Sequence, residues 1–152
     1  MATTSDEVLF IENPRHFERF ACDVLRGLPN CVVERTRDTI HIFYEGEMGA
    51  SLLFTPEAFE VRTASVEWVN NHIPTPTTRL INRYNYLDTT GPMKGGFSYL
   101  SEYMVDLLLK AAELRKSEYK ECKYCKISYP REYRHSDDIC MSCAQTHLGI
   151  FY

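Results

Sequence analysis

The 152-residue sequence lacks several features that would assign it to a class of protein directly. It has no run approaching the roughly 18 apolar residues that read as a membrane span, and its most apolar stretch, 104–112, is interrupted by Asp106 and Lys110. Residues 1–7 are small, polar and acidic, without the basic start and apolar middle of a secretory signal. We therefore expect a cytoplasmic protein that does not interact with membranes.

Familiar catalytic motifs are also missing from the sequence. It contains no phosphate-binding loop, dinucleotide-binding glycine motif, nucleophile elbow or zinc-protease helix motif, and no zinc-deaminase signature. Glu60 and Arg62 weakly resemble the acidic-x-Lys arrangement of metal-dependent nucleases. Arginine, however, is not an equal substitute for that lysine. The same residues are also expected on the solvent-exposed face of a strand. The sequence therefore favours a protein that is not an enzyme, with a metal-dependent nuclease as a further alternative.

The chain also lacks the overall positive charge of a general nucleic-acid binder, because 17 basic residues face 21 acidic ones, for a net charge of −4. The charge is unevenly distributed. Residues 115–134 carry seven basic and three acidic side chains. Such a segment is either a solvated surface of mixed charge or a local patch for an anionic partner.

Cysteine, by contrast, is present in a specific pattern. Four of the six cysteines form two Cys-x-x-Cys pairs, and fourteen residues separate the pairs. A spacing of two residues lets one tight turn direct both sulfurs at a single point, and two such turns supply the four thiolates of a tetrahedral Zn²⁺ site. Because four cysteines leave no open position for water, the sequence predicts a structural zinc ion. Its expected ligands are Cys122, Cys125, Cys140 and Cys143.

The cysteines have other possible roles. A redox pair is expected at the start of a helix after a strand, and two disulfides would need an oxidising compartment. Iron in a four-thiolate site is not separated from zinc by ligand type alone. We interpret His135 and His147 as bystanders because four thiolates are already available. Cys22 and Cys31 belong to no pair, and we expect them to be buried, reduced thiols.

The cysteine segment 122–143 resembles the short four-cysteine zinc-ribbon or treble-clef modules of small bacterial and bacteriophage regulators. The resemblance covers only this segment and implies a zinc-stabilised module of that type. Residues 1–114 resemble no family that we recognise. We expect an α+β domain over residues 1–117 and the zinc module over residues 118–152, continuous with the helix before it.

The pattern of apolar residues and turn signals predicts an α+β fold. Its main body is an antiparallel β-meander of about four strands packed with helices. We expect strands at 31–36, 39–45, 50–55 and 58–64, a short strand at 7–12, helices at 14–28, 77–87 and 97–120, a short helix or edge strand at 65–71, and a hairpin within 127–133. The terminal apolar side chains are expected to pack on the protein or on a partner, and they are Leu148, Ile150, Phe151 and Tyr152.

Basic and aromatic residues interleave around the first cysteine pair and form the predicted recognition surface. Tyrosine and arginine are enriched at binding hot spots, and tyrosines also stack on bases. The leading hypothesis is a zinc-binding regulatory or adaptor protein for a protein component of transcription, replication or defence machinery of bacterial or phage type. The alternative is nucleic-acid binding through the same surface. The predicted partner-binding residues are Lys123, Lys126, Tyr129, Arg131, Tyr133 and Arg134.

Overall fold

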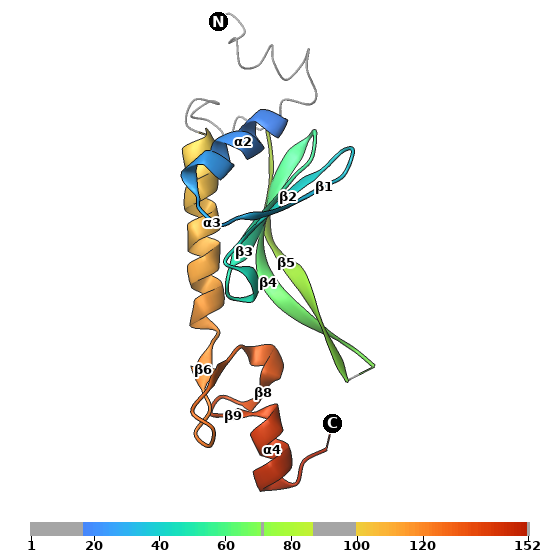
Figure 1. The fold of residues 1–152 in the computed structure, drawn as a ribbon, viewed down its shortest axis with the longest axis vertical. Helices are drawn as coiled ribbons and strands as arrows, with labels where there is room; N and C mark the ends of the chain where they lie inside the picture. The colour runs from blue at the N-terminus through green and yellow to red at the C-terminus, as the bar shows by residue number, and fades with distance from the viewer. Residues whose placement is uncertain (1–16, 71, 87–99, 152) are drawn as a thin grey trace, which may run out of the picture.

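The protein is built on one antiparallel sheet, which the computed structural model shows in Figure 1; the structure describes residues 17–70, 72–86 and 100–151. Five strands follow one another in the order β1-β2-β3-β4-β5, each paired with the strand before it in the sequence. Short connections allow this meander, as predicted, and the α+β fold class is confirmed. The strands are β1 (Val32–Arg35), β2 (Ile40–Tyr44), β3 (Ala50–Phe54), β4 (Ala58–Val69) and β5 (Ile73–Asn85).

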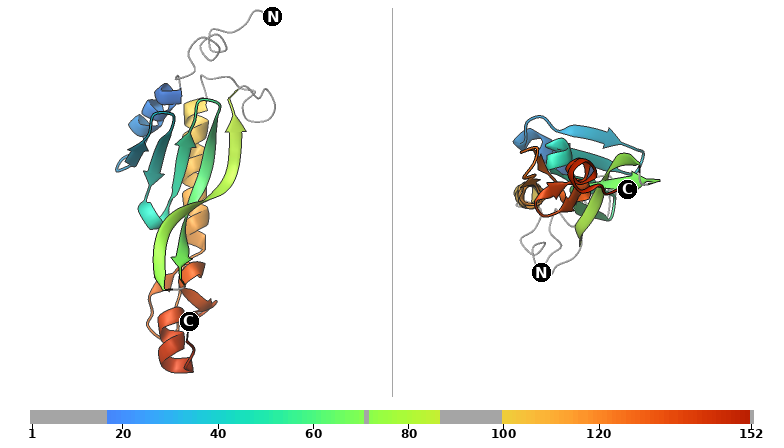
Figure 2. Two further views of the ribbon diagram at one scale, coloured as in Figure 1. Left: turned by 90° about the vertical axis from the view of Figure 1, so that its right-hand side faces the viewer. Right: turned by 90° about the horizontal axis from the view of Figure 1, so that it is seen from below.

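Two helices cover one face of the sheet, α2 (Phe17–Gly27) and α3 (Leu100–Ser117), as Figures 1 and 2 show. Both lie within the predicted helices at 14–28 and 97–120. Buried side chains recur along α3 every three or four residues, so one stripe of the helix faces the sheet. The fully buried apolar core joins both helices to β2, β3 and β4 and consists of Phe17, Val24, Ile42, Leu52, Phe54, Phe59, Met104 and Leu108.

The connection between β2 and β3 is a tight turn that contains the 3-10 helix η1 (Gly46–Met48). Glu45 and Gly46 both have positive φ angles, of 61° and 57°. Gly49 closes the turn so tightly that a Cβ there would lie 1.7 Å from the carbonyl oxygen of Tyr44. Position 49 therefore needs glycine. The turn places the backbone carbonyl of Glu47 against helix α3.

The predicted helix at 77–87 is wrong, because residues 73–85 form strand β5 and pair with β4 along its whole length. The helix-like spacing of apolar residues was misleading, since Leu80 and Ile81 are 48% and 42% exposed. The register shifts at a bulge opposite Val61, where Ile81 is the extra residue. As β5 pairs only with β4, it is an edge strand, where Pro74 and Pro76 are tolerated.

Other expectations are refined by the structure. Residues 65–69 continue β4, which rules out the short helix there and makes β4 and β5 longer than the other strands. The outer parts of these strands, residues 65–70 and 72–79, extend beyond the rest of the sheet, and we call them the hairpin end (Figure 1). The predicted strand at 7–12 and the ends of two predicted helices, at 14–16 and 97–99, lie outside the described residues.

The chain continues from α3 into a small C-terminal region, residues 118–151, which we call the metal module. A two-stranded hairpin does lie between the cysteine pairs, but at residues 134–140 and not within 127–133 as predicted. Residues 128–129 pair instead with residues 120–121, which precede the first cysteine. Phe151 is 90% exposed and so does not pack on the described part of the protein. The elements are β6 (Lys120–Glu121), β7 (Ser128–Tyr129), η4 (Arg131–Tyr133), β8 (Arg134–Ser136), β9 (Ile139–Cys140) and α4 (Met141–Leu148).

A buried arginine in the last turns of α3 joins the helix, the sheet and the metal module. The side chain of Arg115 is 0% exposed. Its Nε donates to the carbonyl oxygen of Glu47 at 3.0 Å, and its Nη1 donates to carboxylate oxygens of Glu118 at 2.7 Å and Glu132 at 2.9 Å. Burial by itself would raise the pKa of Glu118, but hydrogen bonds from Arg79 and Arg115 lower it, so this carboxylate is ionised at neutral pH.

Glu132 also ties the metal module to the hairpin end. Its carboxylate accepts a hydrogen bond from the hydroxyl of Ser65 at 3.2 Å, and its carbonyl oxygen accepts one from the indole Nε1 of Trp68 at 3.0 Å. The ring of Tyr133 meets the Trp68 ring edge-on, with centroids 5.4 Å apart. Helix α3 and strand β4 thus both hold η4 in place.

None of the helices among the described residues has the length and apolar character that crossing a bilayer requires.

We predict that Arg115→Met lowers the free energy of unfolding by about 3–5 kcal/mol, because it removes one partner of a buried ion pair and leaves carboxylates behind. The matched control is Lys110→Met on the same helix, where an exposed pair with Asp106 is lost and the change should stay below about 1 kcal/mol. Chemical denaturation of the metal-loaded protein measures both. Similar losses for the two variants would show that Arg115 does not hold helix α3, the sheet and the metal module together.

Candidate metal centre

The four cysteines of the two Cys-x-x-Cys pairs converge in the metal module. Their sulfur atoms all lie within 4.8 Å of one another, and the sulfurs of Cys125 and Cys140 are 4.0 Å apart. A tetrahedral site with metal–sulfur bonds of about 2.3 Å places its sulfurs about 3.8 Å apart. A disulfide would bring two of them to about 2.05 Å. The four cysteines are therefore arranged to hold a metal ion.

The first pair is held by a tight turn between β6 and β7. The N–H of Cys122 donates to the carbonyl oxygen of Ile127 at 2.9 Å, and the N–H of Lys126 donates back to the carbonyl oxygen of Cys122 at 2.9 Å. Lys126 adopts a left-handed conformation, with φ of 66°, to close the turn. This backbone geometry directs the Cys122 and Cys125 sulfurs to the same side.

The second pair lies where β9 passes into α4. Cys140 is the N-cap of this helix, and its sulfur accepts a hydrogen bond from the N–H of Cys143 at 3.4 Å. The first turn of the helix therefore sets the distance between the two thiols. The N–H of Lys123 donates to the carbonyl oxygen of Asp138 at 2.8 Å, which joins the turn of the first pair to the β8–β9 hairpin.

The surroundings of Cys122 and Cys143 shift the pKa values of these two thiols in opposite directions. Burial raises the pKa of Cys122, but N–H groups of Cys140, Cys125 and Tyr124 donate to its sulfur and bring the pKa down to about 6. Burial and the neighbouring sulfurs raise the pKa of Cys143 to about 12. Four sulfurs at this spacing can all be thiolates only when a metal ion balances their charge. The donor set fits a soft divalent metal.

Tyr129 lies directly against the metal centre. Burial of the Tyr129 hydroxyl and its hydrogen bond to Cys125 together raise the pKa of this tyrosine. Hydrogen bonds of this kind orient metal ligands and adjust their basicity. The sequence interpretation placed Tyr129 on a recognition surface and missed its contact with a ligand, which depends on the pairing of β7 with β6.

The remaining cysteines and the histidines of the module lie apart from the four sulfurs. The ring of His147 stacks on Tyr124 with centroids 4.1 Å apart, and His135 is exposed. Cys22 is exposed and Cys31 is half-buried, so the expectation that both are buried is wrong. Cys22 lies on the outward side of α2, whose buried face is formed by Phe17, Phe20, Ala21 and Val24.

Most basic side chains of residues 115–134 are paired with acidic ones. Of the predicted partner-binding residues, Arg134 is only 10% exposed and donates to the carbonyl oxygen of Glu118 at 3.1 Å, while Tyr133 packs on Trp68. Within the described ranges, Lys126 and Arg131 are exposed and have no ion pair. The ion pairs of the other basic residues are Arg115–Glu132, Lys116–Glu45, Lys120–Asp137, Lys123–Asp138 and Arg134–Asp137.

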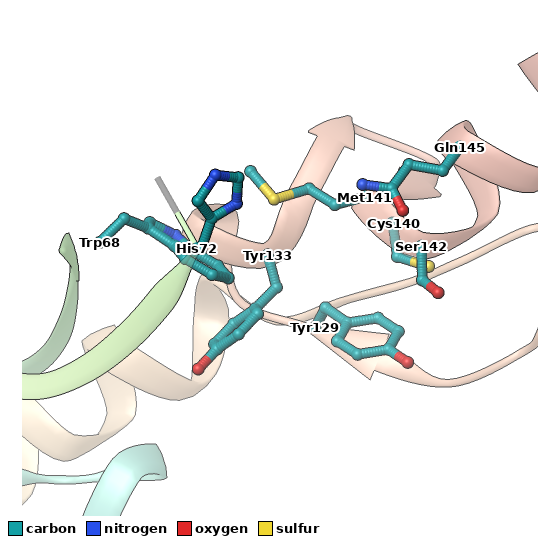
Figure 3. Close-up of a pocket in the computed structure, with 8 residues that line it drawn as sticks. All are labelled: Trp68, His72, Tyr129, Tyr133, Cys140, Met141, Ser142 and Gln145. Carbon is teal, nitrogen blue, oxygen red and sulfur yellow. The ribbon is translucent and has the colours of Figure 1, made fainter. Parts of the chain in front are cut away.

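A groove of about 560 Å³ separates the hairpin end from the metal module, and Figure 3 shows the side chains around it. Trp68 and His72 of the hairpin end line this groove but were not predicted as site residues. No sequence feature near them indicates that residues more than 50 positions later lie opposite. We call this cavity the module groove. Its lining residues are Trp68, His72, Tyr129, Tyr133, Cys140, Met141, Ser142 and Gln145.

The residues behind the nuclease alternative are engaged with one another on the sheet. Arg62 donates to one carboxylate oxygen of Glu60 at 2.6 Å, and Arg83 donates to the other at 3.2 Å. Both oxygens of Glu60 therefore have a cationic partner. In the part of the chain that the structure describes, the four cysteines are the only group of three or more potential metal ligands whose donor atoms converge.

No protein-family model, curated protein or solved structure matches this chain. The function must therefore be argued from the geometry of the site. Four cysteine ligands would complete a tetrahedral shell and leave no position for water or substrate, which is the property of structural rather than catalytic sites.

We predict that the purified protein holds one metal ion per chain and that Cys143→Ser abolishes tight binding, because one of four ligands is lost. Cys22→Ser, which changes an exposed cysteine outside the cluster, should leave the metal content unchanged. Elemental analysis measures the stoichiometry and distinguishes zinc from iron. Cobalt-substituted protein should show the absorption bands of a tetrahedral four-thiolate site. Full metal content in Cys143→Ser would contradict the assignment of this ligand.

We further predict that Tyr129→Phe lowers the metal affinity about 10- to 100-fold, because Cys125 loses its hydrogen bond. Tyr124→Phe, in the turn of the same cysteine pair, is the control and should change the affinity little. Competition with a chelator of known affinity measures both. Equal affinities for Tyr129→Phe and the unchanged protein would show that this hydroxyl does not support the metal ligand.

Proposed function

We propose that the protein is a non-enzymatic adaptor or regulator, in which a structural zinc ion holds the metal module in a shape that binds a protein partner. The observation that carries this proposal is the closed four-cysteine shell, which supports a structural role. We propose a partner from the transcription, replication or defence machinery; the resemblance of the cysteine segment to modules of small bacterial and bacteriophage regulators supports a bacterial or phage system.

The composition of the metal module supports a structural role for the metal. Apart from two of the cysteines, its buried residues are Pro130, Ile139 and Ala144, too few for a hydrophobic core. Regions this small are commonly stabilised by a metal or by disulfides. Zinc is the usual metal of four-cysteine structural sites. The second cysteine pair opens a helix, which favours a treble-clef arrangement over a ribbon with two hairpin turns.

The surface of the metal module favours a protein partner over nucleic acid. Ion pairs neutralise most of its basic side chains, and only Lys126 and Arg131 lack an acidic partner within the described ranges. Apolar side chains are exposed on the same region, including Ile127, Leu148 and Phe151. Exposed apolar side chains favour contact with a protein, whereas nucleic-acid binding depends on unpaired basic ones.

We predict that the zinc-loaded protein retains a partner protein from nuclease-treated extracts of its own cells. The double variant Ile127→Asp with Phe151→Asp should reduce recovery at least tenfold, because it places charges on the exposed apolar surface. Val32→Asp, at the opposite end of the molecule, is the matched control and should leave recovery unchanged. Quantitative mass spectrometry of the retained proteins measures the difference.

Two results would contradict the proposal. Recovery that disappears on nuclease treatment, with an affinity for oligonucleotides that falls steeply as salt is raised, would identify a nucleic-acid-binding protein. Equal recovery by the double variant and the Val32→Asp control would show that the metal module is not the contact surface.

A further inference from the structure

The module groove has the size and position of a binding site. Its volume of about 560 Å³ lies within the range of roughly 300–1,000 Å³ that is typical of ligand pockets. Trp68 and His72 of the hairpin end form one side, and Met141, Ser142 and Gln145 of α4 form the other (Figure 3). The groove therefore exists only when the hairpin end and the metal module are held together.

The walls of the module groove are fixed by contacts already described. The Trp68 indole is held by its hydrogen bond to the carbonyl oxygen of Glu132 and by the edge-on contact with Tyr133. The hydroxyl of Tyr129 is bonded to Cys125, and Cys140 itself lines the groove. A site built on such fixed side chains loses little conformational entropy when a ligand binds.

The side chains that line the groove suit a peptide that inserts one apolar side chain and lays its backbone along the groove. Trp68, Tyr129, Tyr133 and Met141 offer aromatic and thioether surface, on which apolar anchor residues bind well. Ser142 and Gln145 add neutral groups that can donate to and accept from a peptide backbone. No Asp, Glu, Lys or Arg is among the lining residues, so the groove offers no lysine or arginine to a phosphate.

One exposed basic residue without an ion pair lies between residues that line the module groove. Arg131 is in η4, between the groove residues Tyr129 and Tyr133 in sequence. The described part of the chain provides no ion pair for it. A ligand that carries carboxylates beside its anchor would complement this charge.

From this juxtaposition we infer that the module groove binds an extended acidic peptide of a partner protein, with one aromatic or aliphatic anchor residue between Asp or Glu residues. The inference rests on the proposed adaptor function and specifies its ligand. A single-stranded nucleic acid fits less well, because bases would stack on the aromatic rings but their phosphates would meet no lysine or arginine in the groove.

The test is a selection from a random peptide library on the metal-loaded full-length protein. Enriched peptides should share an apolar anchor flanked by acidic residues. A synthetic copy of one enriched peptide, without tryptophan, is then titrated while protein fluorescence is recorded. Because Trp68 is the only tryptophan of the chain, a saturable change in its emission reports binding in the groove.

Two variants probe the two parts of the inference. Met141→Glu places a carboxylate in the groove at a helix N-terminus, where a negative charge is compatible with folding. It should lower the affinity for the peptide at least tenfold, and Met141→Gln should lower this affinity less. Arg131→Glu should also weaken it at least tenfold. Arg26→Glu, an exposed arginine on α2, should have no effect.

Three results would overturn the inference: enriched peptides without acidic flanks, peptide binding that leaves Trp68 emission unchanged, or Trp68 emission that responds to a single-stranded oligonucleotide but to no peptide. Failure here is distinguishable from failure of the adaptor function. A captured partner whose binding survives both Met141→Glu and Arg131→Glu would exclude the groove as its site and leave the adaptor function standing.

Discussion

The structure depends on one buried charge, the guanidinium of Arg115. It only donates hydrogen bonds, to a carbonyl of η1 and to the carboxylates of Glu118 and Glu132 in the metal module, so α3 is joined through it to both the β2–β3 turn and the module. A buried ion pair of this kind contributes little net stability compared with apolar packing, but it is costly to break. We expect it to restrict how the metal module is placed relative to the sheet.

The contacts of Arg115 and Glu132 connect the metal centre with the module groove. A metal ion fixes Cys125 and Cys140, the first of which accepts the Tyr129 hydrogen bond and the second of which lines the groove. Glu132 lies between the two cysteine pairs and holds both Arg115 and Trp68. Losing a bound metal would free the segment that carries Glu132, so metal binding would control the shape of the module groove.

The parts of the fold that could be predicted are those fixed by local sequence. The metal ligands follow from two-residue spacings within tight turns, and the strands up to residue 64 follow from alternation and turn residues. Strand β5 was missed because an edge strand exposes apolar residues such as Leu80, and its pairing with β4 is a long-range interaction. The ion pairing of the basic segment could not be predicted, because Asp137 and Asp138 follow it in sequence but fold back onto Lys120 and Lys123. The contacts of Trp68 with Glu132 and Tyr133 span more than 60 residues and have no local signal.

The most direct test of this account is the emission of Trp68 while the metal is removed stepwise with a chelator. The account predicts that the emission shifts to longer wavelength in proportion to metal loss, because η4 releases the indole to solvent, while circular dichroism shows that the five-stranded sheet persists. Re-addition of zinc should reverse the shift. An emission spectrum that stays unchanged after complete metal removal would show that the metal does not hold the module against the hairpin end, and would contradict the central claim.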